Sequence, residues 1–282
     1  MNRIELSAGT IEYGDTGGDG QPIVFIHGLT IDGSVWRNVV ARLAPDFRCI
    51  TPTLPLGSHR IPMRADADLT IVGMAALVGE FLDAFDLHDA ILVQNDWGGA
   101  QVLIAHRPVE RVAGLVLTSC EAFDNYPPGL PGRALTVAAA IPGGFAAMMQ
   151  VARFAAFRRA PGGWGWMSKR PVPKAVMDRW FEPARENAEV RRDLLRYATS
   201  VPPKPTLAAW AEANRRFTKP VLVVWGTEDK IMPPEHGRRL AELYPDSHLV
   251  ELDDTYTLIP EDRPHALADA IRRRFQPDLR AR

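Results

Sequence analysis

Short apolar runs rich in Val, Ile and Leu alternate with longer segments of helical spacing over the first 120 residues. The runs are apolar at successive positions, which is typical of strands whose two faces are both covered. They fall at 23–26, 47–51, 90–94 and 112–117. The helical segments fall at 34–43, 69–85 and 98–106. We therefore predict strands and helices alternating on a mostly parallel sheet, with Ser34 as the N-cap of the first helix.

The pattern changes after residue 120. No strand-like run occurs from 121 to 217, where Pro and Gly pairs separate segments rich in Ala, Arg and Trp. Strand character returns afterwards and again alternates with helical spacing, at 221–225, 235–243, 248–252 and 265–275. This order predicts an α/β core domain at 1–120 and 218–282, covered by helices on both faces, with a helical cap inserted at 121–217.

Composition and charge narrow the function classes. The 282 residues include 33 basic and 34 acidic side chains, a net charge of −1, which argues against a dedicated nucleic-acid binder. We see neither a secretory signal nor an apolar stretch long enough to span a membrane. The two cysteines, Cys49 and Cys120, fit reduced core thiols and exclude a disulfide framework or a multi-cysteine zinc site. We therefore expect a cytoplasmic protein.

Local charge is less even than net charge. No Asp or Glu occurs from Asn125 to Met177, whereas this stretch contains seven Arg and Lys residues. The simpler interpretation is a solvated basic face of the cap. The alternative is that the stretch attracts an anionic substrate or surface.

The segment 91–100 carries the most informative chemistry. An apolar strand runs directly into Asp96, and Gly98 and Gly99 then permit a tight turn into a helix. Such a turn presents one side chain above the carboxyl edge of the sheet. Because a helix N-terminus favours an anion, we expect Asp96 to be ionised and accessible, as a carboxylate nucleophile must be. The alternative is that Asp96 only caps the helix.

Further motifs surround this turn in a specific order. A strand ends in His27-Gly28-Leu29-Thr30, a later strand ends in Trp225-Gly226-Thr227-Glu228-Asp229, and the helical insertion lies between them. In this ordered combination the chain resembles the α/β-hydrolase superfamily over nearly its whole length. Its Asp-Trp-Gly turn resembles the haloalkane dehalogenase and epoxide hydrolase branches.

The resemblance implies a fold and a set of roles. Asp96 would attack carbon to form a covalent ester, which water then hydrolyses. The backbone N–H groups of Trp97 and Leu29 would face developing negative charge, and the indole of Trp97 would bind halide, with packing as its alternative role. His27, in the turn beside Leu29, would border this oxyanion or substrate region, although such a histidine is usually structural.

The supporting acid has two candidates. Asp229 is the first choice, because the resemblance places it, after the strand that ends at Trp225, where most of the superfamily has its acid; its alternative is a structural role as an N-cap or salt-bridge partner. Glu121 follows the strand that ends near Leu117, where one dehalogenase group places its acid, and its alternative is a structural role. The resemblance implies no cofactor and no metal.

The expected catalytic histidine is absent. Counting back from Pro264 places Tyr256 and Thr257 where the superfamily has Gly-His. Threonine cannot accept a proton at neutral pH, and tyrosine is a poor base. His59, in the loop 54–60 that would border the site, is the candidate replacement; its alternative role is to fix local structure.

We expect a small, mostly apolar substrate and either carbon–halogen or epoxide hydrolysis through Asp96. Thr30 stands where epoxide hydrolases usually have proline, which weakens the epoxide alternative. Epoxide opening also needs acidic tyrosines, and the insertion contains Tyr126 and Tyr197. Tyr126, near the start of the insertion, could reach the cleft; its alternative role is simple packing. The missing histidine favours an alternative, a non-hydrolytic lyase, isomerase or cyclase, or a degenerate ligand-binding member. Ester hydrolysis is a further alternative, although attack by a carboxylate would give an anhydride. The sequence leaves open whether the chain is a monomer or a homodimer.

Overall fold

An eight-stranded sheet runs through the computed structural model, which describes residues 1–276. The strand order is β1-β2-β4-β3-β5-β6-β7-β8; β1 and β2 pair in antiparallel fashion, and the other six strands are parallel. The strands are β1 (Asn2–Leu6), β2 (Gly9–Asp15), β3 (Pro22–Ile26), β4 (Arg48–Thr53), β5 (Ala90–Asp96), β6 (Val112–Cys120), β7 (Val221–Gly226) and β8 (Ser247–Leu252). All six strands predicted from apolar runs are present. The β1–β2 hairpin was not predicted, because most of its residues are only partly buried or exposed and its sequence contains no continuous apolar run.

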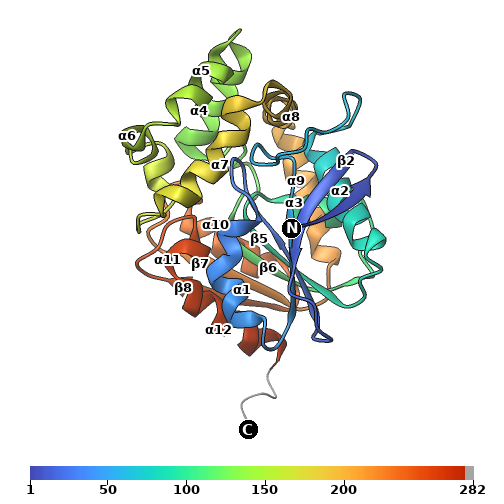
Figure 1. Ribbon diagram of the computed structural model, residues 1–282. Coiled ribbons are helices and arrows are strands. Elements are labelled where there is room, and N and C mark those ends of the chain that lie inside the picture. The colour runs from blue at the N-terminus through green and yellow to red at the C-terminus, as the bar shows by residue number, and fades with distance from the viewer. Residues whose placement is uncertain (277–282) are drawn as a thin grey trace.

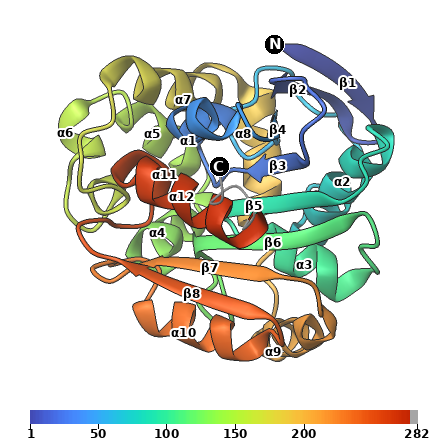
Figure 2. The ribbon, with the colours of Figure 1, turned by 90° about the horizontal axis from the view of Figure 1, so that it is seen from below.

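Helices cover both faces of the sheet (Figure 2). One layer consists of α1 (Arg37–Leu43), α11 (Ile259–Asp262) and α12 (Pro264–Phe275). The other consists of α2 (Ile71–Ala84), α3 (Gly99–His106), α9 (Lys204–Ala213) and α10 (Pro234–Leu243). The predicted α/β class is therefore confirmed. Among the described residues, no helix is both long and apolar enough to cross a membrane.

The prediction that Ser34 caps the first helix is wrong. A short 3-10 helix, Gly33–Trp36, precedes α1, and Asp32 is its N-cap. The Asp32 carboxylate accepts a hydrogen bond from the backbone N–H of Ser34 at 2.9 Å. A carboxylate two residues earlier thus satisfies a free N–H of the first turn.

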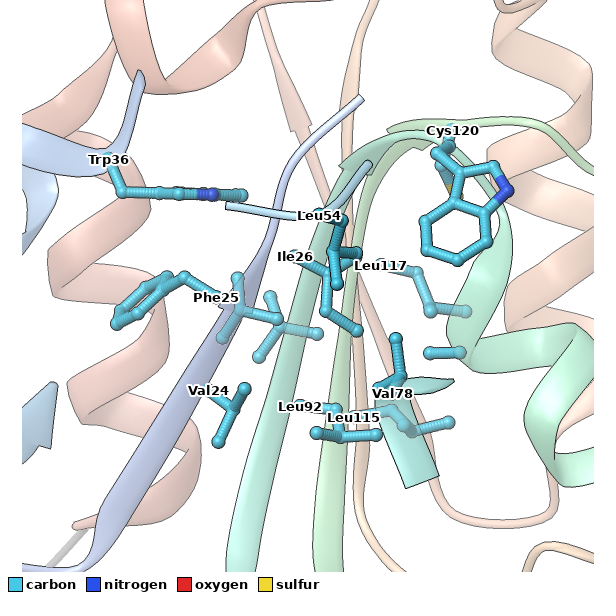
Figure 3. Close-up of a cluster of buried hydrophobic side chains, with 14 of the residues drawn as sticks. Val24, Phe25, Ile26, Trp36, Leu54, Val78, Leu92, Leu115, Leu117 and Cys120 are labelled. Atoms are coloured by element: carbon cyan, nitrogen blue, oxygen red, sulfur yellow. The ribbon is translucent and has the colours of Figure 1, made fainter. Parts of the chain in front are cut away.

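The core lies between the sheet and these two helical layers. Side chains of β3, β5 and β6 pack between Trp36 on one side and Val78 of α2 on the other (Figure 3). Phe25 and Trp36 pack with their ring centroids 5.1 Å apart. Close packing of this kind resists deformation, so the carboxyl ends of β3, β5, β6 and β7 form a fixed platform.

The cap lies over this platform (Figure 1). It consists of α4 (Gly129–Ala140), α5 (Gly144–Val151), α6 (Ala155–Arg158), α7 (Lys174–Glu186) and α8 (Ala188–Ala198). The last helix of the inserted segment, α9, packs instead on α3, and Asn214 Nδ2 donates to the carbonyl of Gln101 at 3.2 Å. The segment 121–217 thus ends with a helix that belongs to the layer covering the sheet.

Candidate active site

A cavity of about 310 Å³ lies between the carboxyl edge of the sheet and the cap. Its walls are mostly apolar, with Leu135, Met149 and Phe181 among the cap residues and Leu29 and Ile231 among those of the core. Asp96 and Glu121 are the charged residues among the described lining residues, which include no Lys, Arg or His. An apolar small molecule fits such a cavity better than an anion does.

Asp96 is held at the floor of the cavity by its backbone and by the neighbouring strand. It ends β5 with a φ of 64°, a conformation that is unusual outside glycine. The backbone N–H of Leu29 donates to Asp96 Oδ2 at 3.0 Å. Gly28 permits this approach, because a Cβ atom there would lie 1.9 Å from the same oxygen. The turn after β3 thus lies against the turn after β5 and contacts the Asp96 carboxylate.

Burial determines the protonation of Asp96. The side chain is 6% exposed, and loss of hydration raises its pKa to about 7. The N–H of Leu29 lowers this pKa, whereas the nearby negative charge of Asp229 raises it. The helix N-terminus alone therefore does not fix the ionised form of Asp96, because burial opposes it and moves the pKa toward neutral pH.

Asp229 lies beside Thr257, the residue at the position expected for histidine. Thr257 Oγ1 donates to Asp229 Oδ1 at 2.9 Å, and the backbone N–H groups of Ile231 and Met232 donate to the same oxygen at the same distance. Asp229 Oδ2 is buried and has no hydrogen-bond partner within residues 1–276. Burial raises the pKa of Asp229 to about 6. Asp229 and Thr257 are thus adjacent. Thr257 donates to one carboxylate oxygen of Asp229 and leaves the other, Oδ2, without a hydrogen bond within residues 1–276.

Glu121 and two tyrosines form the polar part of the cavity wall. Glu121, just after β6, accepts a hydrogen bond from the N–H of Gly98 at 3.4 Å, and burial raises its pKa well above the usual range. Tyr126 and Tyr197 also line the cavity, with ring centroids 6.4 Å apart. The Tyr197 hydroxyl is buried near Glu121 without a hydrogen bond of good geometry. Tyr197 was noted in the sequence as a tyrosine of the insertion, but its spacing gave no sign that α8 would bring it here.

The structure does not place His59 at the cavity. Its Nε2 lies 3.1 Å from Asp193 Oδ2 of α8, and its Nδ1 accepts from the N–H of Gly57 at 3.4 Å. Both side chains are buried, and neither is among the lining residues. Because both ring nitrogens are already engaged, the geometry favours the structural alternative over a role as catalytic base.

His27 is also held by the backbone. The N–H of Leu54 donates to its Nε2 at 2.8 Å, so Nδ1 carries the proton and donates to the carbonyl of Gly28 at the same distance. Burial lowers the pKa of His27 to about 4, so the ring stays neutral. The ring links the ends of β3 and β4 and is not among the residues that line the cavity, which favours the structural role over a place in the oxyanion or substrate region.

Trp97 is turned away from the main cavity. Its backbone N–H donates to the carbonyl of Asn95 at 2.7 Å. Its indole N–H is buried without a partner beside a second, smaller pocket of about 50 Å³, which Trp210 and Asn214 also line. Of the two N–H groups expected to face negative charge, the one from Leu29 contacts Asp96; that of Trp97 does not.

No group of three His, Cys, Asp or Glu side chains within residues 1–276 is placed to hold a metal ion.

Comparison with known proteins defines the family. A model of the alpha/beta hydrolase family matches residues 23–270. The chain belongs to this family. It is 30% identical to haloalkane dehalogenase 2 of Mycobacterium tuberculosis, over 96% of this chain and 93% of the relative. It is 27% identical to a cis-3-alkyl-4-alkyloxetan-2-one decarboxylase of Xanthomonas campestris, over 96% of this chain and 94% of the relative.

Solved structures share the fold. Haloalkane dehalogenase DbeA from Bradyrhizobium elkani superimposes with a TM-score of 0.74 at 22% identity, covering 95% of this chain and 94% of that one. A thermophilic esterase from Thermogutta terrifontis has a TM-score of 0.67 at 22% identity, covering 97% of each chain. These structural matches confirm the predicted α/β-hydrolase fold, a fold that carries more than one activity. The predicted relation to haloalkane dehalogenases is confirmed by the relative that is 30% identical.

Proposed function

We propose that the protein is an enzyme in which Asp96 displaces a leaving group from a saturated carbon of a small apolar molecule. The observation that carries this proposal is the position of Asp96, a carboxylate held by the N–H of Leu29 at the floor of an apolar cavity. Carbon–halogen cleavage is the leading reaction, because the curated relatives at 30% identity are named haloalkane dehalogenases.

The first step needs only groups that line the cavity. An oxygen of ionised Asp96 forms a bond to carbon while the carbon–halogen bond breaks, and the halide leaves with the electron pair. Burial raises the pKa of Glu121 well above its usual value and so favours the neutral carboxyl group, which can donate a hydrogen bond to the leaving anion, as can the Tyr197 hydroxyl. The same attack would open an epoxide if Tyr126 or Tyr197 gave its proton to the alkoxide.

Hydrolysis of the ester formed on Asp96 would be slow in this site. Water that attacks the Asp96 ester must lose a proton, and imidazole is absent from the described lining residues. Thr257 cannot take that proton, and burial, which raises the pKa of Glu121, favours the form of Glu121 that already carries a proton. We therefore expect haloalkanes to give a long-lived ester.

This missing base favours a second candidate reaction, the decarboxylation of a four-membered lactone. Asp96 would attack the ring carbon that bears the alkyl–oxygen bond, and that bond would break to release the substrate's own carboxylate. Loss of CO₂ would then form an alkene and expel the Asp96 carboxylate. Neither step consumes water or transfers a proton. Curated relatives named as oxetan-2-one decarboxylases support this alternative.

Two substrates test the proposal. With 1-bromohexane, we expect bromide release in a burst of one equivalent per protein, followed by slow turnover, and no burst from Asp96→Asn. With a cis-3,4-dialkyloxetan-2-one, the second candidate predicts many turnovers to alkene and CO₂. Fast multiple turnover of 1-bromohexane would contradict the claim that the site lacks a base for hydrolysis of the ester. Inertness toward both substrates, with no adduct, would overturn the nucleophilic role of Asp96.

A further inference from the structure

The cap carries an apolar surface that the fold leaves uncovered. Six large hydrophobic residues between 130 and 157 have exposed fractions of 36% to 60%. They are Leu130, Val137, Ile141, Val151, Phe154 and Phe157. Helix α4 contains no buried residue, although its sequence is mostly apolar. Single exposed hydrophobic residues are normal, but a concentration of them on one part of a molecule marks an interaction surface.

These residues lie on neighbouring elements. Helices α4, α5 and α6 lie together at the end of the molecule opposite the C-terminus (Figure 1), and α4 packs against α5. In α4, residues 130, 133 and 137 have helical spacing and are exposed, as is Ile141 just after the helix, whereas Gly132, Leu135 and Thr136 line the cavity. The helix thus has an inner side for the cavity and an outer apolar side with one arginine.

The charge of this surface has a single sign. Arg133, Arg153 and Arg159 are exposed and have no carboxylate partner within residues 1–276, whereas the nearby Arg158 pairs with Asp178 at 2.6 Å. The guanidinium of Arg153 lies 4.6 Å from the ring centroid of Phe154. No acidic residue occurs from 125 to 177 to balance these charges.

We propose that this surface, the cap face, docks on an anionic lipid surface. It comprises Leu130, Arg133, Val137, Ile141, Val151, Arg153, Phe154, Phe157 and Arg159. Apolar side chains interspersed with arginines suit the boundary between lipid headgroups and acyl chains, where the apolar groups are buried and the cations meet lipid phosphates. A second copy of the chain, facing this one through the same patch, would bring like charges together.

Docking would place the cavity next to the lipid. Phe157 belongs to both the cap face and the cavity wall, and Pro161 and Gly162 continue that wall. An apolar molecule dissolved among acyl chains would therefore have a short path to Asp96. This consequence rests on the proposed function, whereas docking itself does not.

Co-sedimentation with lipid vesicles tests the docking. We expect the full chain to bind vesicles of phosphatidylcholine mixed with phosphatidylglycerol, to bind pure phosphatidylcholine vesicles weakly, and to be released by molar salt. The triple variant R133Q/R153Q/R159Q should lose about 100-fold in partition coefficient, about 5-fold for each arginine. The double variant V137S/F154S should lose binding by removal of apolar contact. Both changes lie on exposed positions, and circular dichroism would verify folding.

A matched control removes the same charge elsewhere. R215Q/R238Q/R273Q neutralises three exposed arginines outside the cap and should bind as the wild type does. Equal loss in this control, or unchanged binding in both cap-face variants, would overturn the proposal. So would failure of the wild type to bind anionic vesicles, or a stable dimer in solution that V137S/F154S dissociates. None of these readouts depends on catalysis.

Discussion

A buried carboxyl group without a cationic partner costs folding free energy, and Asp96 is such a group. Its pKa of about 7 in the folded protein lies above the ordinary value of 3.8, so the folded state holds a proton that the unfolded chain releases as pH rises. The destabilisation is absent below the ordinary value, grows between the two pKa values and is complete above about pH 7. The site thus keeps a reactive group at the expense of stability.

Asp96→Asn should therefore stabilise the protein at pH 8 by about 2–4 kcal/mol, because an amide has no charge to desolvate. Its oxygen can still accept from the N–H of Leu29. The gain should be much smaller at pH 4. Urea unfolding of both proteins at the two pH values measures it, and an identical difference at both would show that the Asp96 pKa is not raised by folding.

A second residue-scale prediction concerns Thr257. Thr257→His would place an imidazole beside Asp229, whose Oδ2 is free, and should speed hydrolysis of the Asp96 ester by about 100-fold. Thr257→Val, which removes the hydrogen bond to Asp229 without adding a base, is the control. The decay rate of the adduct formed from 1-bromohexane is the measurement. No acceleration in a folded Thr257→His protein would show that the base is not what limits hydrolysis.

At the scale of elements, a buried polar contact joins helix α8 of the cap to the segment that follows β4 in the core. Asp193 of α8 accepts from His59 Nε2 and from the N–H of Met63, at 3.1 and 2.8 Å, and both of these partners lie in the segment after β4. Removing the His59 ring would leave Asp193 Oδ2 with only the N–H of Met63, while Arg192 still pairs with Asp193 Oδ1 at 2.7 Å, so a buried charge would lose part of its compensation. This contact explains why the loop histidine is buried.

His59→Ala should therefore destabilise the protein by about 2–4 kcal/mol while the rate of ester formation at Asp96 stays near that of the wild type. Asp193→Asn serves as the matched change on the other partner and should also reduce stability. Denaturant unfolding and single-turnover bromide release measure the two effects. Loss of ester formation in a stable, folded His59→Ala protein would restore His59 to a role in the chemistry.

Strands and helices of the core could be predicted because continuous apolar runs and helical spacing are local properties. Asp96 and Asp229 could be placed for the same reason, since each follows a predicted strand by a few residues. The replaced position Thr257 could be placed by counting back from Pro264 along the motif of the superfamily. The placements of His59 and Trp97 could not, because they depend on which distant partner each ring meets. Asp193 lies 134 residues from His59, and no local pattern pairs the two.

At the scale of the whole molecule, several polar contacts join the cap to the core. Ser58 Oγ donates to the carbonyl of Trp180 at 2.7 Å, Arg179 pairs with Asp32 at 2.6 Å, and Ser168 Oγ donates to Asp262 Oδ1 at 2.7 Å. The cap's own buried cluster is small, comprising Phe145, Met149, Ala184, Val190 and Leu194. The cap therefore depends on the core for much of its stability.

We expect the cap and core to unfold in one cooperative transition. Calorimetry should give a single peak whose calorimetric and van't Hoff enthalpies agree, and tryptophan fluorescence and far-ultraviolet circular dichroism should change together. Trp164 and Trp166 report on the cap. Two separated transitions, the first with loss of part of the helical signal together with a change in tryptophan fluorescence, would show that the cap is an independent unit.

The most direct test of the account is the mass of the intact protein after exposure to 1-bromohexane, followed by peptide mapping. The account predicts a gain of one hexyl group in place of a proton, located on Asp96, which persists in the wild type and is absent from Asp96→Asn. An unmodified protein that releases no bromide, or a hexyl group on any residue other than Asp96, would contradict it.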